Sequence, residues 1–260
     1  MDIFQGLIIG VIEGFTEFLP ISSTAHMVLA ANAMKIAQTD FIKSFEIIIQ
    51  FGAILSVVVL YWKRFLVDFE SLKRVLAAFI PTAVIGFILY KIIKTYLISN
   101  ETIIVWSLFL GGIFLIVFEL FHREKDTAHE DLSTIPYGKC VAIGLFQCFA
   151  MFPGVSRSAA TIIGGLILNL KRKTIVEFSF LLAVPTMLAA SVLDLLKSGS
   201  SFSPSQFEVL AVGFIVSFIV AIISIKFLLN FIKKHTFIPF GIYRIIIALI
   251  FMASMYFSIH

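Results

Sequence analysis

The chain has 260 residues, of which 60% are hydrophobic and 14% are charged, and its formal net charge is +4. A soluble domain of this size is usually about half apolar and about a quarter charged. The excess of apolar residues, which includes 29 phenylalanines, excludes an ordinary soluble domain and predicts a polytopic membrane protein. The basic balance fits positively charged cytoplasmic loops, and no long basic stretch indicates nucleic-acid binding.

The first apolar region, at about residues 3–34, differs from a simple membrane span. Its centre, Leu19-Pro-Ile-Ser-Ser-Thr-Ala-His26, is polar and contains a proline, so each half is too short to cross a bilayer alone. We therefore expect a re-entrant helix pair, whose broken backbone needs protein or water around it. Because this region carries Glu13 and Glu17 and follows no basic segment, we do not expect a cleaved signal peptide.

Six uninterrupted stretches are long enough to cross a bilayer as helices. Three follow the first broken region, and three follow a second broken region at about 138–170, which Phe152–Thr161 interrupts in the same way. The predicted spans are 41–62, 75–97, 102–121, 174–196, 207–230 and 240–258.

Basic residues gather in alternate connections of this path. Placing those connections in the cytoplasm puts both termini outside, together with the linkers at 99–101 and 197–206. The first broken pair then opens to the outside and the second to the cytoplasm. The basic residues are Lys63, Arg64, Lys73, Arg74, Arg123, Lys125, Lys171, Arg172, Lys173, Lys233 and Lys234.

The two halves of the chain also coincide when one is shifted by 134 positions. Each half is a broken pair followed by three spans, and this odd number of crossings inverts the second copy. Inverted repeats with broken helices are typical of secondary transporters. We predict an all-α polytopic membrane protein, a single membrane domain over 1–260, with repeats at 1–121 and 137–260. Ile9, Gly10, Phe15, Phe18, Ser22 and Ala25 meet Ile143, Gly144, Phe149, Phe152, Ser156 and Ala159, and Glu13 meets Gln147.

Acidic and nucleophilic side chains occur together at the first break. Glu13 and Glu17 are one helical turn apart and share a face. Beyond Pro20, Ser23 and His26 are neighbours in the next helix. Two adjacent carboxylates suit a hard divalent cation. The residues that can cap this second helix are Ser22, Ser23 and Thr24.

The second break carries basic chemistry. Gly154 permits an irregular turn, and Ser156 and Ser158 flank Arg157 at a second helix start. Helix starts attract phosphate, and a guanidinium binds phosphate with a planar fork. We expect Arg157 to contact the same pyrophosphate as the cluster at the first break. The alternative is an ion-pair network that only fixes the packing.

The sequence resembles a known enzyme family. Glu13-Gly-Phe-Thr-Glu17, followed by Phe-Leu-Pro-Ile-Ser-Ser-Thr-Ala-His26, resembles the first signature of the undecaprenyl-diphosphate phosphatases of the bacitracin-resistance type. Pro153–Thr161 resembles their second signature, and Phe45-Glu-Ile-Ile-Ile-Gln50 is also similar. The resemblance covers essentially the whole chain.

This resemblance implies a multi-pass enzyme of the bacterial plasma (inner) membrane. Its substrate would be a polyprenyl diphosphate lipid, undecaprenyl diphosphate. It would release inorganic phosphate and recycle undecaprenyl phosphate for cell-wall synthesis, which confers bacitracin resistance. The active site would face outside and depend on Mg²⁺ or Ca²⁺. The alternative is a transporter or flippase for phosphate-bearing lipids.

The roles that we predict fall into four groups. The catalytic group is His26, Ser23, Glu17, Glu13 and Arg157, with Glu13 and Glu17 as metal ligands. The phosphate-binding group is Arg157, Ser156, Ser158, Ser22, Ser23, Thr24, Gly154 and Thr161, and a supporting group is Gln147, Glu46 and Gln50. The nucleophile stays open between His26, Ser23 with His26 or Glu17 as base, and a metal-bound water, with His26 favoured.

The remaining polar residues have simpler interpretations. Glu119 and Arg244 are expected near span ends, with their charged groups reaching the interface. Cys140 and Cys148 are expected to be unpaired core residues, and the loop that contains His122 and His129 to be solvated. Small residues such as Gly111 and Gly112 would permit the close helix contacts of a homodimer.

Overall fold

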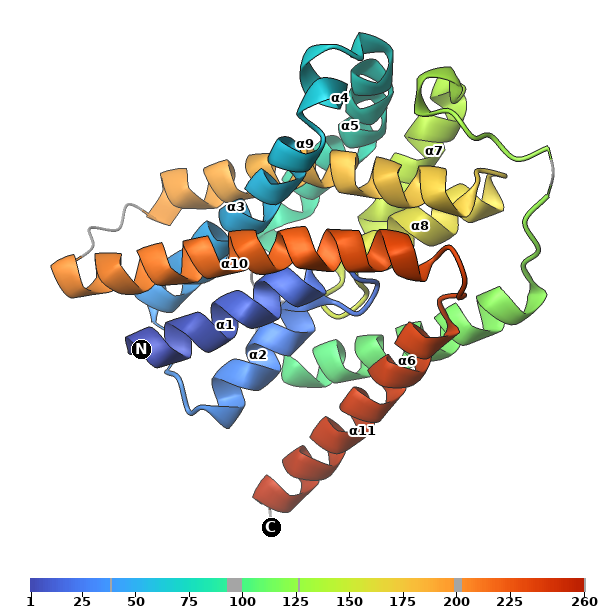
Figure 1. Cartoon of the computed structure of the whole chain (residues 1–260). Helices are drawn as coiled ribbons and strands as arrows, with labels where there is room; N and C mark the ends of the chain where they lie inside the picture. The colour runs from blue at the N-terminus through green and yellow to red at the C-terminus, as the bar shows by residue number, and fades with distance from the viewer. Residues whose placement is uncertain (38, 93–99, 126, 199–202, 260) are drawn as a thin grey trace.

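The computed structural model describes residues 1–37, 39–92, 100–125, 127–198 and 203–259. The described chain is almost entirely helical (Figure 1), and its only extended pairing is a single bridge between His129 and Leu170. The helices are α1 (Ile3–Thr16), α2 (Ser23–Ala33), α3 (Asp40–Leu60), α4 (Trp62–Leu66), α5 (Phe69–Ile92), α6 (Glu101–Phe121), η2 (Leu132–Thr134), α7 (Tyr137–Cys148), η3 (Phe149–Met151), α8 (Arg157–Ile167), α9 (Arg172–Ser198), α10 (Pro204–Phe231) and α11 (Ile238–Ile259).

Six helices are long and apolar enough to cross a membrane, which confirms the predicted number of spans. They are α3, α5, α6, α9, α10 and α11. The prediction was wrong at the start of α5, which begins at Phe69 rather than 75. The Asp68 carboxylate accepts a hydrogen bond from the Ser71 amide, so the helix starts before the apolar run. The end predicted for that span, and parts of both predicted linkers, lie outside the described residues.

Both broken regions consist of two short helices joined by irregular backbone, as predicted. Helices α2 and α8 each have 11 residues and start 134 positions apart, at Ser23 and Arg157. The residues that precede them, Ser22 and Ser156, have φ angles of 72° and 77°. Each serine hydroxyl accepts a hydrogen bond from the amide three residues later. The two helix starts therefore share an unusual backbone conformation.

The helices of the two halves pack across each other. Helix α1 packs against α10, while α7 packs against α5, so the broken pair of each half contacts the second span of the other half. Helix α6 crosses α11 (Figure 1). Gly6, Gly10 and Gly14 lie one turn apart on α1 and let its backbone approach α10, because a Cβ at Gly10 would lie 2.8 Å from the Gly213 carbonyl. This packing directs both breaks toward the middle of the molecule.

Two charged residues expected to reach the interface are instead buried, which corrects that prediction. Glu119 pairs with both terminal nitrogens of Arg172 and accepts a hydrogen bond from the Phe237 amide. Arg244 has no exposed surface, because backbone carbonyls accept hydrogen bonds from its guanidinium. Both charges therefore have internal partners, and neither needs to reach water.

The small residues of α6 also have partners within the chain. A Cβ at Gly111 would collide with the Arg244 guanidinium, and one at Gly112 would lie 2.8 Å from the Gly241 carbonyl. These glycines therefore allow α6 to pack against α11, and they give no support for a homodimer. Cys140 and Cys148 are unpaired, as expected.

Candidate active site

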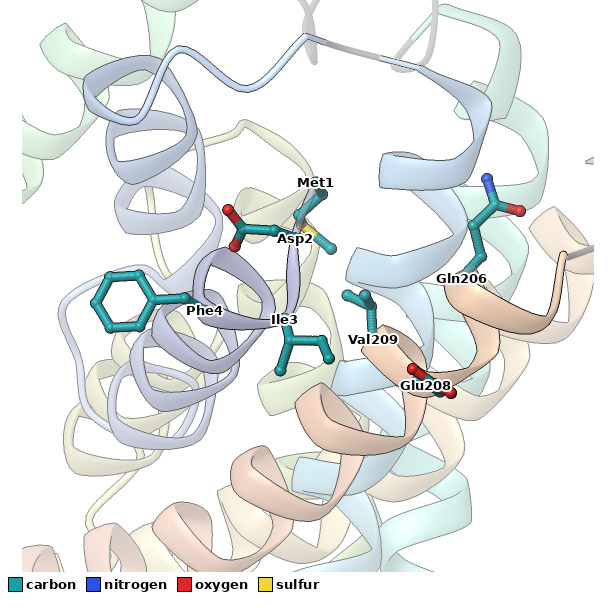
Figure 2. A pocket seen from close by; sticks show the side chains of 7 residues that line it. All are labelled: Met1, Asp2, Ile3, Phe4, Gln206, Glu208 and Val209. Carbon is teal, nitrogen blue, oxygen red and sulfur yellow. The ribbon is translucent and has the colours of Figure 1, made fainter.

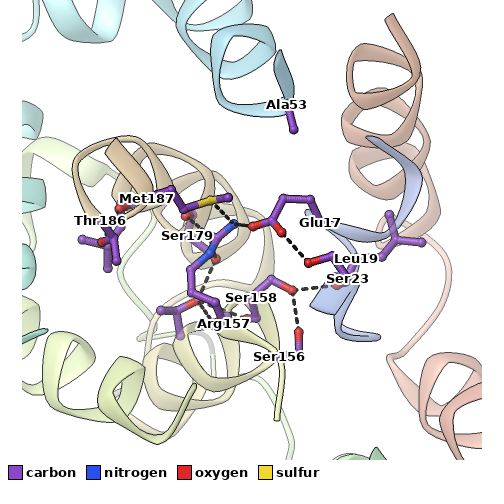
Figure 3. Close-up of polar contacts among 12 residues, drawn as sticks. Glu17, Leu19, Ser23, Ala53, Ser156, Arg157, Ser158, Ser179, Thr186 and Met187 are labelled. Atoms are coloured by element: carbon purple, nitrogen blue, oxygen red, sulfur yellow. Dashed lines mark hydrogen bonds and ion pairs between the residues drawn. The ribbon is translucent and has the colours of Figure 1, made fainter. Parts of the chain in front are cut away.

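The two breaks meet, as the sequence led us to expect (Figure 3). Arg157, the first residue of α8, donates from Nη2 to Oε1 of Glu17 at 2.9 Å. The Ser158 hydroxyl donates to the Leu19 carbonyl at 2.8 Å. The Arg157 and Glu17 side chains are only 11% and 7% exposed, so this ion pair is shielded from bulk water. One charge from each half of the chain is thus placed at a single site.

Glu17 also joins a hydroxyl to this ion pair. The Ser23 hydroxyl donates to Oε2 of Glu17 at 2.6 Å, while Arg157 occupies Oε1. A hydroxyl that donates to a carboxylate can pass its proton to that carboxylate when the oxygen attacks an electrophile. Ser23, Glu17 and Arg157 therefore place a hydroxyl, a carboxylate and a cation within one hydrogen-bonded chain.

Arg157 is fixed from α9 as well as from the first break. Its Nη1 donates to the Ser179 carbonyl at 2.7 Å, and its guanidinium lies 5.8 Å from the centre of the Phe18 ring. The Ser179 hydroxyl lies 2.6 Å from the Thr161 hydroxyl, which links α8 to α9. The buried Nε–H of Arg157 has no hydrogen-bond partner. The guanidinium thus keeps a donor that an oxyanion could use.

Glu13 is the least satisfied acid of the site. Its side chain is fully buried, and neither carboxylate oxygen has a hydrogen-bond partner. The charges of Glu17 and Glu46 repel it, and only Arg157 offsets them. The described residues form no cluster of three or more metal-ligating side chains. The two free oxygens of Glu13, beside the Glu17 carboxylate, nevertheless fit a hard divalent cation whose other ligands are phosphate oxygens and water.

His26 contacts Tyr243 rather than Ser23, its expected neighbour in the helix. Its Nδ1 lies 2.8 Å from the Ser22 carbonyl, which can only accept, so this nitrogen carries a proton. Its Nε2 lies 2.9 Å from the Tyr243 hydroxyl, and the two rings stack 5.5 Å apart. His26 makes no hydrogen bond to Ser23 or Glu17, so Glu17, and not His26, contacts the Ser23 hydroxyl.

The other predicted phosphate-binding residues of the second break hold the backbone together. The Ser156 hydroxyl caps α8 and contacts the Ser158 hydroxyl at 3.2 Å. Thr161 bonds to backbone carbonyls of its own helix and to Ser179. Gly154 has a φ of +93°, and a Cβ there would lie 2.4 Å from the Ile104 carbonyl. These contacts fix the shape of the break around Arg157.

The predicted supporting residues divide into two groups. Gln147 donates to the Thr82 and Thr186 hydroxyls at 2.8 and 3.0 Å, and its buried Oε1 has no partner. Glu46 and Gln50 lie half-buried on α3, where Glu46 adds negative charge near Glu13. Thr24 is half-buried in the first turn of α2 and makes no hydrogen bond through its side chain.

Sequence reasoning missed three residues of this region. Ser179 orients Arg157, Tyr243 bonds to His26, and Arg244 donates to carbonyls of both breaks. The only signal for each in the sequence was a polar residue within an apolar span, and it did not indicate which residue would be the partner.

A separate hollow lies at the starts of α1 and α10 (Figure 2), about 20 Å along α1 from the breaks. It is lined by Met1, Asp2, Ile3, Phe4, Gln206, Glu208 and Val209.

Comparison with known proteins places this arrangement in a family. Residues 6–250 match the family model described as bacitracin resistance protein BacA. The chain belongs to this family. A BacA relative from Aquifex aeolicus, named undecaprenyl-diphosphatase, is 52% identical over 257 residues, which cover 99% of this chain and 100% of that protein. Undecaprenyl-diphosphatases from Sulfurihydrogenibium sp. and Persephonella marina are 52% and 46% identical over 96% and 97% of this chain, and over 98% of each protein. The BacA assignment therefore applies to both breaks and all six spans.

Proposed function

We propose that this protein is an integral membrane phosphatase that hydrolyses undecaprenyl diphosphate to undecaprenyl phosphate and inorganic phosphate. The carrying observation is the chain of hydrogen bonds from Ser23 through Glu17 to Arg157. It supplies a nucleophile, its base and a phosphate-binding cation in a family whose relatives are named for this reaction. The reaction regenerates the lipid carrier for cell-wall synthesis, and the family name connects it with bacitracin resistance.

The side chains account for the chemistry in two displacements. The Ser23 oxygen attacks the terminal phosphorus, its proton moves to Glu17, and the bond to the bridging oxygen breaks, which releases undecaprenyl phosphate. That proton then passes from Glu17 to the departing lipid phosphate. In the second displacement, water attacks the phosphoserine and gives a proton to Glu17, which passes it to the Ser23 oxygen as the bond to phosphorus breaks and inorganic phosphate leaves. Arg157 offsets the negative charge that builds on the phosphoryl oxygens. Its contacts with Ser179 and Phe18 keep it in place during both steps.

A divalent cation, Mg²⁺ or Ca²⁺, is the cofactor that we propose for this site. Glu13 and Glu17 would hold it, since Glu13 offers two buried oxygens without partners. When bound, such an ion neutralises phosphate charge and polarises the phosphoryl group. It would also relieve the repulsion among Glu13, Glu17 and Glu46. Chelation should therefore abolish phosphate release, and either ion should restore it.

We further propose that α1–α2 and α7–α8 are re-entrant pairs in an inverted repeat, with the active site open to the outside of the plasma membrane. The matching helix starts and the exchanged packing of α1 on α10 and α7 on α5 support the repeat. The first and second apolar helices of each pair are too short to span a bilayer. Labelling of single cysteines at exposed positions, Ala37→Cys beside the first pair and Gly138→Cys beside the second, from each side of sealed vesicles tests the orientation.

Phosphate release from a C55 lipid diphosphate by the detergent-solubilised protein tests the activity directly. We expect stoichiometric release of orthophosphate, which depends on a divalent cation. A transporter or flippase needs two compartments and would release none in detergent. Absence of release in the presence of Mg²⁺ or Ca²⁺ would therefore favour transport over hydrolysis.

Trapping the phosphorylated enzyme tests the nucleophile. We expect label from the terminal phosphate of the substrate to appear on Ser23, as an acid-stable and base-labile phosphoserine. Label that is lost in acid and kept in base would assign the attack to His26 instead. Turnover without a trapped phosphoenzyme, in a variant that slows the second displacement, would point to direct attack by water.

A further inference from the structure

Arg244 is a buried cation that no step of the proposed reaction uses. It lies in α11, and none of its surface is exposed. Its guanidinium has five N–H donors, and five backbone carbonyls accept from it. The acceptors are Leu108 for Nε at 3.3 Å, Pro20 and Val155 for Nη1 at 3.3 and 2.9 Å, and Ser107 and Gly154 for Nη2 at 3.2 and 2.8 Å.

These acceptors belong to three separate parts of the fold. Pro20 lies in the first break, Gly154 and Val155 lie in the second, and the other two carbonyls belong to α6. Carbonyls in a break lack the helical partners that they would have in a continuous helix, and an unpaired carbonyl is costly inside a membrane protein. One guanidinium therefore satisfies carbonyls of both breaks and joins them to α6 and α11.

The charge of Arg244 is compensated by backbone carbonyls. In the described part of the chain no carboxylate lies within ion-pair distance of it. A buried arginine is usually paired with an acid, because a buried lone charge is expensive. Here the carbonyl dipoles of the breaks replace that acid. Because a peptide group is planar and trans, a carbonyl aimed at Arg244 also turns the following N–H away from it. The guanidinium thus fixes the orientation of the break peptides.

We propose that Arg244 is a positioning residue that holds the two breaks in register, so that Arg157 of one faces Glu17 and Ser23 of the other. It acts through backbone carbonyls and does not contact the phosphate. The expected effect of Arg244 on kcat rests on the proposed function, whereas its role in holding the backbone of the two breaks does not.

Two variants test this role without removing a reacting group. Arg244→Lys keeps the charge but offers three donors at one point, which cannot reach three parts of the fold. Gly111→Ala keeps Arg244 itself, but its new Cβ would lie 2.1 Å from Nη2 and displace the guanidinium. Gly138→Ala is the matched control, since this helical glycine has no neighbouring atom within 4 Å of an added Cβ.

The readouts are steady-state kinetics of the monodisperse fraction and hydrogen exchange of the break amides. We expect Arg244→Lys to lower kcat about 100-fold, as misplaced catalytic groups do, with a smaller change in KM. Gly111→Ala should also lower kcat more than it changes KM, but by a smaller factor of about tenfold. In both variants, amides of residues 17–23 and 152–158 should exchange faster than in the wild type, and in Gly138→Ala they should not.

Unchanged exchange at both breaks in Arg244→Lys and Gly111→Ala would overturn the proposal, and so would an unchanged kcat. If Arg244→Lys does not fold, Gly111→Ala decides alone. If the wild type releases no phosphate, the proposed function fails, and the exchange measurement still decides whether Arg244 holds the breaks.

Discussion

The first break, residues 17–22, and the second, residues 149–156, lead into helices of equal length through a serine of similar backbone conformation. In each, a serine with φ near 75° caps the helix that follows. The positive φ recurs where these two helices end, at Lys35 and Asn169, again 134 positions apart. The backbone at both ends of these helices thus matches, while the breaks themselves differ, because Pro20 lies where the second break has Gly154 with a φ of +93°.

The side chains on this common backbone differ. The side of the first break carries acids and a hydroxyl, while the second carries the guanidinium that pairs with Glu17. The comparison teaches that the two breaks supply similar helix starts, and that the candidate site takes its carboxylate from one break and its cation from the other. At matching positions, Glu13 corresponds to Gln147, Glu17 to Met151, Ser23 to Arg157, and His26 to Ala160.

The largest expected effect concerns the first residue of α2. Ser23→Ala removes the proposed nucleophile, and phosphate release should fall by about 10⁴-fold or more. Ser56→Ala is the control, because Ser56 is also buried but bonds only to a carbonyl of its own helix. Initial rates of phosphate release measure both. A Ser23→Ala rate within tenfold of the wild type would show that Ser23 is not the nucleophile, and that the first break does not supply one through this residue.

The matching residue of α8 should have a smaller effect. Arg157→Lys keeps a positive charge, but a lysine cannot reach Glu17 and the Ser179 carbonyl together. We expect kcat to fall by about 10²–10³-fold, the usual effect of losing a group that stabilises developing negative charge. Lys73→Arg, an exchange of the same two residue types on an exposed side chain, is the control. Equal rates for Arg157→Lys and the wild type would show that only a charge is needed.

Much of this arrangement could be predicted from the sequence, because the physical signals are local. Apolar length gave the six spans, and Pro20 and Gly154 marked the two breaks. The meeting of Glu17 with Arg157 followed from the cost of leaving either charge alone in a membrane.

Other features could not be predicted, because their partners are not encoded by side-chain patterns. Arg244 bonds only to backbone carbonyls, which every residue possesses. Tyr243 reaches His26 across 217 positions of sequence, and no spacing indicates that contact. Glu119 was placed at the interface because its partner Arg172 was assigned to a loop.

A third test compares Glu13 with Gln147, the amide at the matching position. Glu13→Gln removes a proposed metal ligand, so the divalent-ion concentration for half-maximal activity should rise by about tenfold or more. Gln147→Leu removes two hydrogen bonds to threonines and should lower the thermal stability without shifting the metal requirement. Metal titrations of activity, with direct Mn²⁺ binding as a second measurement, separate the two. An equal shift in both variants would contradict the assignment of the metal to the first break.

The smallest expected effect tests the shared backbone itself. Ser22→Ala and Ser156→Ala each remove a capping hydroxyl while keeping a side chain in the left-handed region. Each should lower the free energy of unfolding by about 1 kcal/mol. Ser22→Gly and Ser156→Gly lose the same cap, but glycine adopts a positive φ without strain, so their cost should be a few tenths of a kcal/mol.

Equal losses at the two serines would mean that the two starts are energetically equivalent copies. Thermal unfolding in detergent measures all four variants, with Ser133→Ala in the short helix η2 as the reference for a serine outside the breaks. The clearest outcome is that Ser22→Ala and Ser156→Ala lower the free energy of unfolding equally while Ser23→Ala and Arg157→Lys lower the rate of phosphate release unequally. Stability would then report the backbone that the two helix starts share, and catalysis would report the different side chains that they carry. A cost confined to one serine would instead show that the matching φ angles arise from different local forces.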